Sequence, residues 1–348
     1  MAAKIKDVAA RAQVSMSTVS KVLKGTYSIS DDTKDRVYRA IQELGYYPNS
    51  LAEKFSRNSS NQVAVFIDVD SRPPHNYNYD ILTGIESVLR DEGYMTTVAD
   101  QSFISSNFNY AEQLIRENRL RALIIHASCL NNPDIRAWLG KATFPYVVIG
   151  DPHSEETISW IDYDNTVAGE ILANHIIDEG FSNVHFIGGD EYDILTSTRL
   201  SGIQRAYERR GLVFEDSHIH SCSDHLVRES YEIARRLMRN ESPDAIITVD
   251  NSSALSVYHG VAHEGKRIPE DVAVAGFDNV PIAHALTPPL TVVDLDMSEL
   301  GANTARVLLS HLRSPEMKMQ YRMLAPKLLK RPSTIISQSV STVGSTAG

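Results

Sequence analysis

The chain has 348 residues, of which 42% are hydrophobic and 22% charged, so it is long enough for two or three soluble domains. It has no apolar run long enough to cross a membrane, no signal-peptide core in its first residues and only two cysteines, so we expect a cytoplasmic protein without a disulfide framework. Residues 1–60 hold ten Lys or Arg against six Asp or Glu, a charge of +4, which leaves −14 of the net charge of −10 for the rest. A small basic segment on an acidic chain predicts a polyanionic partner for that segment, although a solvated charged face would give the same count.

Residues 1–46 are predicted to form a small domain of three helices. Apolar residues recur at helical spacing over 5–12 and over 18–23, with a turn at 13–15 between them, and a third stripe runs over 30–44. This is the plan of a helix-turn-helix domain, whose second helix enters the major groove of DNA. An ordinary three-helix bundle would show the same spacing.

The outer face of the second predicted helix carries side chains suited to reading DNA. Lys21 can donate to guanine or to phosphate, Ser17 can donate or accept, and Met16 offers an apolar contact to a thymine methyl group. These side chains favour the DNA-binding interpretation over the plain bundle.

Two neighbouring stretches carry a family resemblance. "IKDVAARAQVSMSTVSKVLKG" and "ISDDTKDRVYRAIQELGYYPNSLA" resemble, without a gap, the DNA-binding head of the lactose-repressor-like (LacI/GalR) transcriptional regulators. The resemblance implies a homodimer that binds a pseudopalindromic operator. It places two groups of side chains at the DNA: base-reading Met16, Ser17 and Lys21, and phosphate-contacting Ser15, Thr18 and Ser20. Lys4 departs from the capping Thr that is usual in the family, so we expect the first helix to start less firmly.

Residues 47–61 are predicted to be a hinge helix and linker. Asn49 can cap a helix of two turns, which is marginal when isolated. The resemblance implies that this helix orders on DNA and inserts a side chain, usually Leu, into the central minor groove. Phe55 stands at that position here, and a Phe wedge can also unstack a base step and kink the duplex.

The rest of the chain alternates apolar runs with helical stripes, which predicts α/β lobes built on parallel sheets. The runs that we interpret as strands cover residues 63–69, 122–127, 146–150, 184–189, 245–250 and 272–278. They are too many for one modest sheet, so two lobes are expected. "DYDNTVAGEILANHIIDEGFSNVHFIGG" and "RIPEDVAVAGFDNVPIAHALTPPLT" resemble the two-lobed, periplasmic-binding-protein-like sensor of the same family.

The resemblance also implies how the sensor, residues 62–332, is divided. Three crossovers are expected near 161–163, 288–291 and 318–321. The predicted segments are 62–161 and 291–318 for lobe N, 163–288 and 321–332 for lobe C, and 333–348 for a flexible tail. The tail lacks the leucine heptads of a coiled coil, which favours a dimer over a tail-linked tetramer.

A small-molecule effector is expected between the lobes, at the carboxyl ends of the strands. The residues carried over from the family as effector contacts are Tyr77, Arg199, His225, Asp250 and Asp278. Carboxylates, an arginine fork and a ring suit a polyol, so a sugar or sugar derivative is predicted. A nucleobase or other non-sugar metabolite acting as a co-repressor is the alternative. Arg199 could instead be a surface arginine, and Asp278 could merely cap a loop.

No catalytic constellation, cofactor or metal is predicted. "GVAHEGKR" has the spacing of a phosphate loop but ends on Arg267 where Ser or Thr should hold magnesium. "HIHSCSDH" gathers His218, His220, Cys222 and His225 without a standard zinc spacing. We therefore expect a regulator and not an enzyme.

Overall fold

The computed structural model describes eight ranges of the chain, which are 3–23, 29–45, 60–67, 77–153, 158–190, 193–223, 226–314 and 321–335. The chain forms two compact units, Met1–Ser60 and Asn61–Gly348, and each is described by itself. Asn49, Phe55 and His225 lie outside the described residues, as do the side chain of Tyr77 and the end of the tail. Within the described ranges, no helix is long and apolar enough to cross a membrane.

The first unit is the predicted three-helix domain. Its helices are α1 (Ile5–Ala12), α2 (Met16–Leu23) and α3 (Asp31–Leu44). One side chain from each helix, Val8, Val19 and Val37, is completely buried in a shared core. The apolar stripes of the sequence therefore face one another, as helical periodicity requires.

The start of α1 has a substitute for the missing cap. Lys4 cannot accept a hydrogen bond through its ammonium group, but its backbone N–H donates to the Asp7 carboxylate at 2.8 Å. Asp7 also lies in the first turn, where a negative charge suits the helix dipole. Asp7 thus supplies half of a capping box at a helix that lacks the usual Thr.

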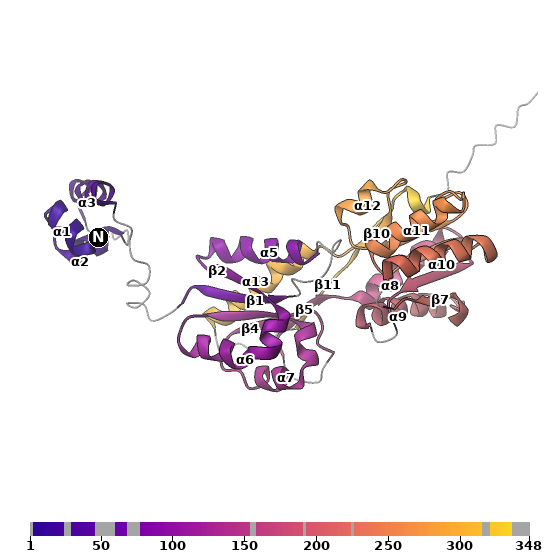
Figure 1. Ribbon diagram of the computed structural model, residues 1–348, viewed down its shortest axis with the longest axis horizontal. Coiled ribbons are helices and arrows are strands. Elements are labelled where there is room, and N and C mark those ends of the chain that lie inside the picture. The colour runs from indigo at the N-terminus through magenta and orange to yellow at the C-terminus, as the bar shows by residue number, and fades with distance from the viewer. Residues whose placement is uncertain are drawn as a thin grey trace, which may run out of the picture. The chain divides into compact units, whose positions relative to one another are not determined.

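The second unit contains two six-stranded sheets with helices on both faces (Figure 1). Sheet A has the order β11-β5-β4-β3-β1-β2 and is wholly parallel. Its strands are β1 (Gln62–Ile67), β2 (Met95–Asp100), β3 (Ala122–His126), β4 (Tyr146–Ile149), β5 (Trp160–Tyr163) and β11 (Tyr321–Leu324). We call this sheet and its helices lobe N.

Sheet B forms lobe C and has the order β12-β10-β9-β8-β6-β7, parallel except for the pairing of β10 with β12. Its strands are β6 (Val184–Gly188), β7 (Ile219–Ser221), β8 (Ala245–Thr248), β9 (Ala273–Phe277), β10 (Thr291–Asp294) and β12 (Lys327–Leu329). The predicted parallel two-sheet architecture is confirmed.

The helices of lobe N are α5 (Tyr77–Asp91), α6 (Gln101–Arg116), α7 (Pro133–Leu139) and α13 (Met297–Arg313). The helices of lobe C are α8 (Asn165–Asp178), α9 (Ile194–Arg209), α10 (Leu226–Asn240), α11 (Asn251–His263) and α12 (Pro281–Ala285). Short 3-10 turns occupy Ala127–Asn131, Asp216–His218 and Pro332–Thr334. Alternate residues of β1 point to opposite faces of sheet A. Val65 packs in the core with α5 and α13, whereas Phe66 packs in the core with α6 and α7.

Each lobe contains a pair of helices that cross in close contact through glycines. In lobe N, a Cβ on Gly301 of α13 would lie 2.0 Å from a backbone oxygen of α5, and one on Gly84 of α5 would lie 1.9 Å from a backbone oxygen of α13. In lobe C, Gly169 of α8 and Gly202 of α9 are equally tight, at 2.1 and 2.0 Å. No side chain fits at these crossings, so the backbones set the distance between the helices.

The chain passes between the two sheets three times, after β5, after β10 and after β11. Two of these crossings come later than predicted. Residues 291–294 still belong to sheet B as β10, so that crossing lies at 295–296 and not at 288–291. Residues 321–324 belong to sheet A as β11, so the last crossing lies at 325–326 and not at 318–321.

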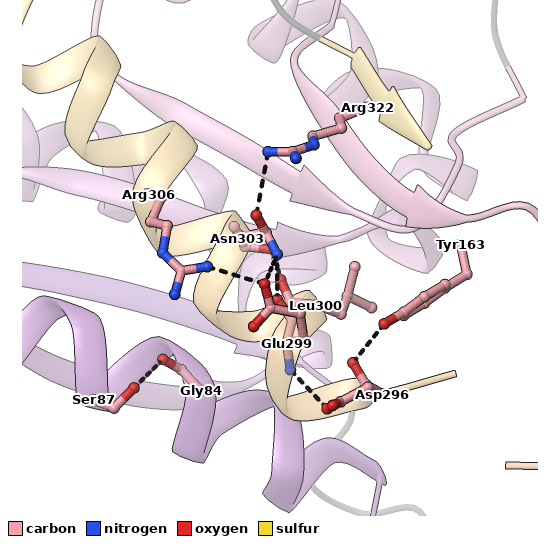
Figure 2. A network of polar contacts seen from close by, with 10 residues as sticks. Gly84, Ser87, Tyr163, Asp296, Glu299, Leu300, Asn303, Arg306 and Arg322 are labelled. Atoms are coloured by element: carbon pink, nitrogen blue, oxygen red, sulfur yellow. Dashed lines mark hydrogen bonds and ion pairs between the residues drawn. The ribbon is translucent and has the colours of Figure 1, made fainter. Parts of the chain in front are cut away.

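Hydrogen bonds tie the three crossing segments together on the lobe N side (Figure 2). The Tyr163 hydroxyl, at the first crossing, donates to the backbone carbonyl of Asp296 at the second, at 3.0 Å. The Asp296 side chain accepts from the Glu299 N–H at 2.9 Å. Asn303 donates to Glu299 and accepts from Arg322 of β11 at 3.2 Å. All three connections are therefore anchored to the start of α13.

Candidate functional site

The predicted DNA-reading face of α2 is exposed. Met16, Ser17 and Lys21 all face solvent, while Val19 and Val22 are buried beneath them. Ser17 and Lys21 are four residues apart and therefore lie on one side of the helix. The helix presents to solvent the side chains that the sequence assigned to base reading.

Hydroxyl groups cluster at the start of α2. Ser15 Oγ accepts from the Thr18 N–H at 3.1 Å, which makes Ser15 the cap of the helix. The same oxygen lies 2.6 Å from Ser17 Oγ and 2.8 Å from Thr18 Oγ1. Ser15 thus has a structural role in addition to its predicted phosphate contact.

In the sensor, Arg199 of α9 is only 2% exposed, which excludes a surface role. Its Nε donates to Asn165 Oδ1 at 3.1 Å, and its Nη1 donates to the Val249 carbonyl at 2.5 Å. Its guanidinium lies 4.3 Å from the centre of the Phe277 ring, and Nη2 lies 3.7 Å from Asp278 Oδ1. The arginine therefore contacts groups from three strand ends. One follows β5, one follows β8, and two lie at the end of β9 or directly after it.

Asp278 is positioned by an unusual backbone and by Asn251. Its φ of +69° lies in the left-handed region, which turns the chain sharply after β9. Asn251 Nδ2 donates to the carbonyls of Phe277 and Asp278 at 2.8 and 3.0 Å. Asn251 was not among the predicted contacts, yet it fixes the strand ends around Arg199.

Asp250 caps α11. One carboxylate oxygen accepts from the Ser253 N–H at 2.7 Å and from the Ser253 hydroxyl at 2.6 Å. A cap explains why an acidic residue stands directly before this helix. An additional contact of Asp250 with an effector stays a prediction, as do those of Tyr77 and His225.

Lobe N contributes a half-buried carboxylate that the sequence did not reveal. Asp162, at the end of β5, accepts from the N–H groups of Asp151 and Tyr163 at 3.1 and 2.7 Å. Burial raises the pKa of the Asp162 carboxyl to about 6, the charge of Asp151 adds to the rise, and Arg199 opposes it. Asp162 is thus close enough to Arg199 for the two charges to influence each other.

His218 and His220 of "HIHSCSDH" form a histidine stack with His185 of β6. The ring centroid of His185 lies 4.1 Å from that of His218 and 5.2 Å from that of His220. His185 Nδ1 and His220 Nε2 are 2.9 Å apart, and Arg236 donates to His220. Burial lowers the pKa of both His185 and His220 to about 4. In the described part of the chain, no group of three His, Cys, Asp or Glu residues is arranged to hold a metal ion.

The fold and these two sites define a class of protein, a helix-turn-helix head joined to a two-lobed, periplasmic-binding-protein-like α/β domain. Family comparison agrees, because "Periplasmic binding protein-like domain" matches residues 173–334 and "Bacterial regulatory proteins, lacI family" matches residues 4–49. The chain therefore combines a lacI-type DNA-binding domain with a periplasmic-binding-protein-like domain.

Individual relatives match over nearly the whole length. The Ribose operon repressor of Escherichia coli (strain K12) is 26% identical over 95% of this chain and 99% of that protein. The structure of the Lac repressor dimer bound to operator and the anti-inducer ONPF has a TM-score of 0.80 at 20% identity, covering 97% of this chain and 100% of that one. The transcriptional regulator CelR-cellobiose complex has a TM-score of 0.69 at 24% identity, covering 95% and 99%.

Proposed function

We propose that the chain is a cytoplasmic, homodimeric transcriptional repressor that binds a pseudopalindromic operator and is controlled by a small-molecule effector. The observation that carries the proposal is the exposed face of α2, with Met16, Ser17 and Lys21 over a buried apolar side. The basic charge of the head supports a polyanionic partner. In this proposal Asn49 and Phe55 add a minor-groove contact.

The homodimer is supported by apolar side chains along the free edge of sheet A. β2 is the terminal strand of that sheet, and large apolar residues are exposed on it and on the neighbouring helices. They are Tyr79, Met95, Val98, Phe103 and Tyr110, with exposed fractions between 39% and 70%. A second copy would cover this surface and protect the strand edge.

The effector is proposed to bind around Arg199, most simply as a sugar or sugar derivative. Arg199, Asp278 and Asp250 offer a donor fork and carboxylate acceptors that suit hydroxyl groups. The cellobiose bound to CelR is a relevant precedent. Binding would change the operator affinity only through different affinities for two arrangements of the lobes.

Selection of a DNA site from a random pool tests the proposal. We expect the full chain to enrich a pseudopalindrome and to bind it with an affinity that falls by roughly 10³-fold or more between 50 and 200 mM salt. Enrichment of no palindrome, or an affinity that does not change with salt, would contradict DNA binding through the head.

A further inference from the structure

Five helices that start at the carboxyl ends of parallel strands are capped by aspartates. The caps are Asp100 on α6, Asp164 on α8, Asp193 on α9, Asp250 on α11 and Asp296 on α13, and each accepts one or more backbone N–H groups of its helix. A helix N-terminus with free N–H groups attracts phosphates and carboxylates. Here the aspartates occupy those groups and place a negative charge where an anion would bind.

The carboxyl ends of the parallel strands are acidic as well. Within three residues after each parallel strand, the described chain holds six aspartates, which are Asp151, Asp164, Asp190, Asp250, Asp278 and Asp296. In the same positions the described chain holds one Lys and no Arg, and this Lys327 is in register with Asp294. Arg199 already has Asp278 at 3.7 Å. An incoming anion would therefore meet an arginine whose charge is compensated, among carboxylates that repel it.

A buried acceptor gives independent evidence. Asn251 is 8% exposed, and no donor in the described part of the chain reaches its Oδ1. Its Nδ2 is fully used by the carbonyls of Phe277 and Asp278, so the amide orientation is fixed. A buried acceptor favours a ligand that brings an O–H or N–H group, which an ionised carboxylate or phosphate group does not supply.

We propose that the effector site selects against anions and takes a neutral or amine-bearing, hydroxyl-rich molecule. Sugars, amino sugars and nucleosides fit this site, whereas sugar phosphates, sugar acids and nucleotides do not. The inference rests on the proposed effector function of the Arg199 site and narrows the chemistry of its ligand.

Matched compounds test the proposal on the full chain. Each set pairs a neutral compound with its charged relatives: glucose with glucosamine, glucose 6-phosphate and glucuronate; ribose with ribose 5-phosphate; adenosine with its monophosphate. Thermal shift ranks the sets, and calorimetry gives dissociation constants for the strongest one. We expect the neutral or amino member to bind at least tenfold more tightly than the anionic one. An anionic member that binds as tightly as its neutral parent, or more tightly, overturns the proposal.

Charge-neutralising variants test the cause. Asp278→Asn and Asp162→Asn, measured at pH 8 where Asp162 is ionised, should each reduce the discrimination against the anionic member at least threefold. Glu208→Gln, an exposed change on α9, should leave the discrimination unchanged. Unaltered discrimination in both aspartate variants would contradict our explanation. Operator release is measured separately: a neutral ligand that binds without altering operator affinity refutes effector control but not the selection against anions.

Discussion

Asp278 Oδ1 lies 3.7 Å from Arg199 Nη2, and the arginine is 2% exposed. This pair of a buried arginine and a half-buried carboxylate joins α9 to the turn after β9, and it lies where effector binding is proposed. Residues at such a position affect both the stability of the sensor and its response to a ligand.

Arg199→Ala should abolish the effector response and leave operator affinity nearly unchanged. Loss of the arginine also removes an ion-pair contact of Asp278 and the donor to the Val249 carbonyl, so we expect a loss of about 3 kcal/mol in the free energy of unfolding. Urea denaturation and operator titration with and without effector measure the two effects. Arg205→Ala, an exposed ion-pairing change on the same helix, should cost less than about 1 kcal/mol. An Arg199→Ala protein that still responds with unchanged effector affinity would disprove this placement of the site.

Ser15→Ala and Lys21→Ala should separate the structure of the head from its contacts with DNA. Ser15 caps α2, so its loss should reduce head stability by about 1 kcal/mol and weaken binding to all DNA sequences. Lys21→Ala should leave the stability unchanged. If Lys21 contacts phosphate, the salt slope of binding should fall by about 1, and if it reads guanine, the preference at one base pair should relax. Operator binding unaffected by Lys21→Ala would remove this residue from the DNA interface.

The histidine stack should make lobe C sensitive to acid. The pKa of His185 is about 4 in the folded chain and 6.5 in the reference state, so its neutral form is favoured by folding. The stability linked to it is fully present above pH 6.5 and is lost as the pH falls toward 4, by about 2 kcal/mol at pH 5. His218, His220 and Arg236 oppose protonation, and the nearby Glu241 carboxylate, 3.9 Å from His185, favours it. Urea denaturation at pH 7 and pH 5 measures the loss.

His185→Gln provides the comparison for that measurement. This variant should be less stable at pH 7 but should lose less stability between pH 7 and 5 than the parent chain. Equal losses would show that other groups cause the acid sensitivity.

Gly301→Ala should disrupt lobe N. The new Cβ would lie 2.0 Å from the Ile81 carbonyl oxygen, so α5 and α13 would have to separate, at a cost of about 3 kcal/mol. Gly140→Ala is the matched control, because Gly140 has a φ of −61° and its nearest atoms are 3.5 Å from the added carbon. Thermal unfolding compares the two variants. Similar midpoints would mean that the helix crossing adapts to the extra carbon.

Much of the fold could be predicted from local patterns. Residues 63–67 are buried on both faces of the sheet, so the apolar composition of this run alone indicates the strand β1. β2 was not predicted, because it is an edge strand whose polar residues, such as the exposed Thr97, interrupt any apolar run. The crossings after β10 and β11 were placed too early, because strand membership depends on pairing with distant segments: β11 pairs with β5, more than 150 residues earlier.

The residues of the candidate site also fall into two groups, those predicted from the sequence and those recognised only in the structure. The family resemblance singled out Arg199 and Asp278, and the expectation that they lie near one another follows because parallel strands bring their carboxyl ends to one edge. The sequence by itself also determined the exposed face of α2, since helical spacing separates buried from exposed side chains within one short segment. Only the tertiary structure showed that Asp162 and Asn251 belong to the site and that Asp278 compensates the charge of Arg199. Those properties arise from burial and from distances between segments that are far apart in the chain, which no local pattern contains.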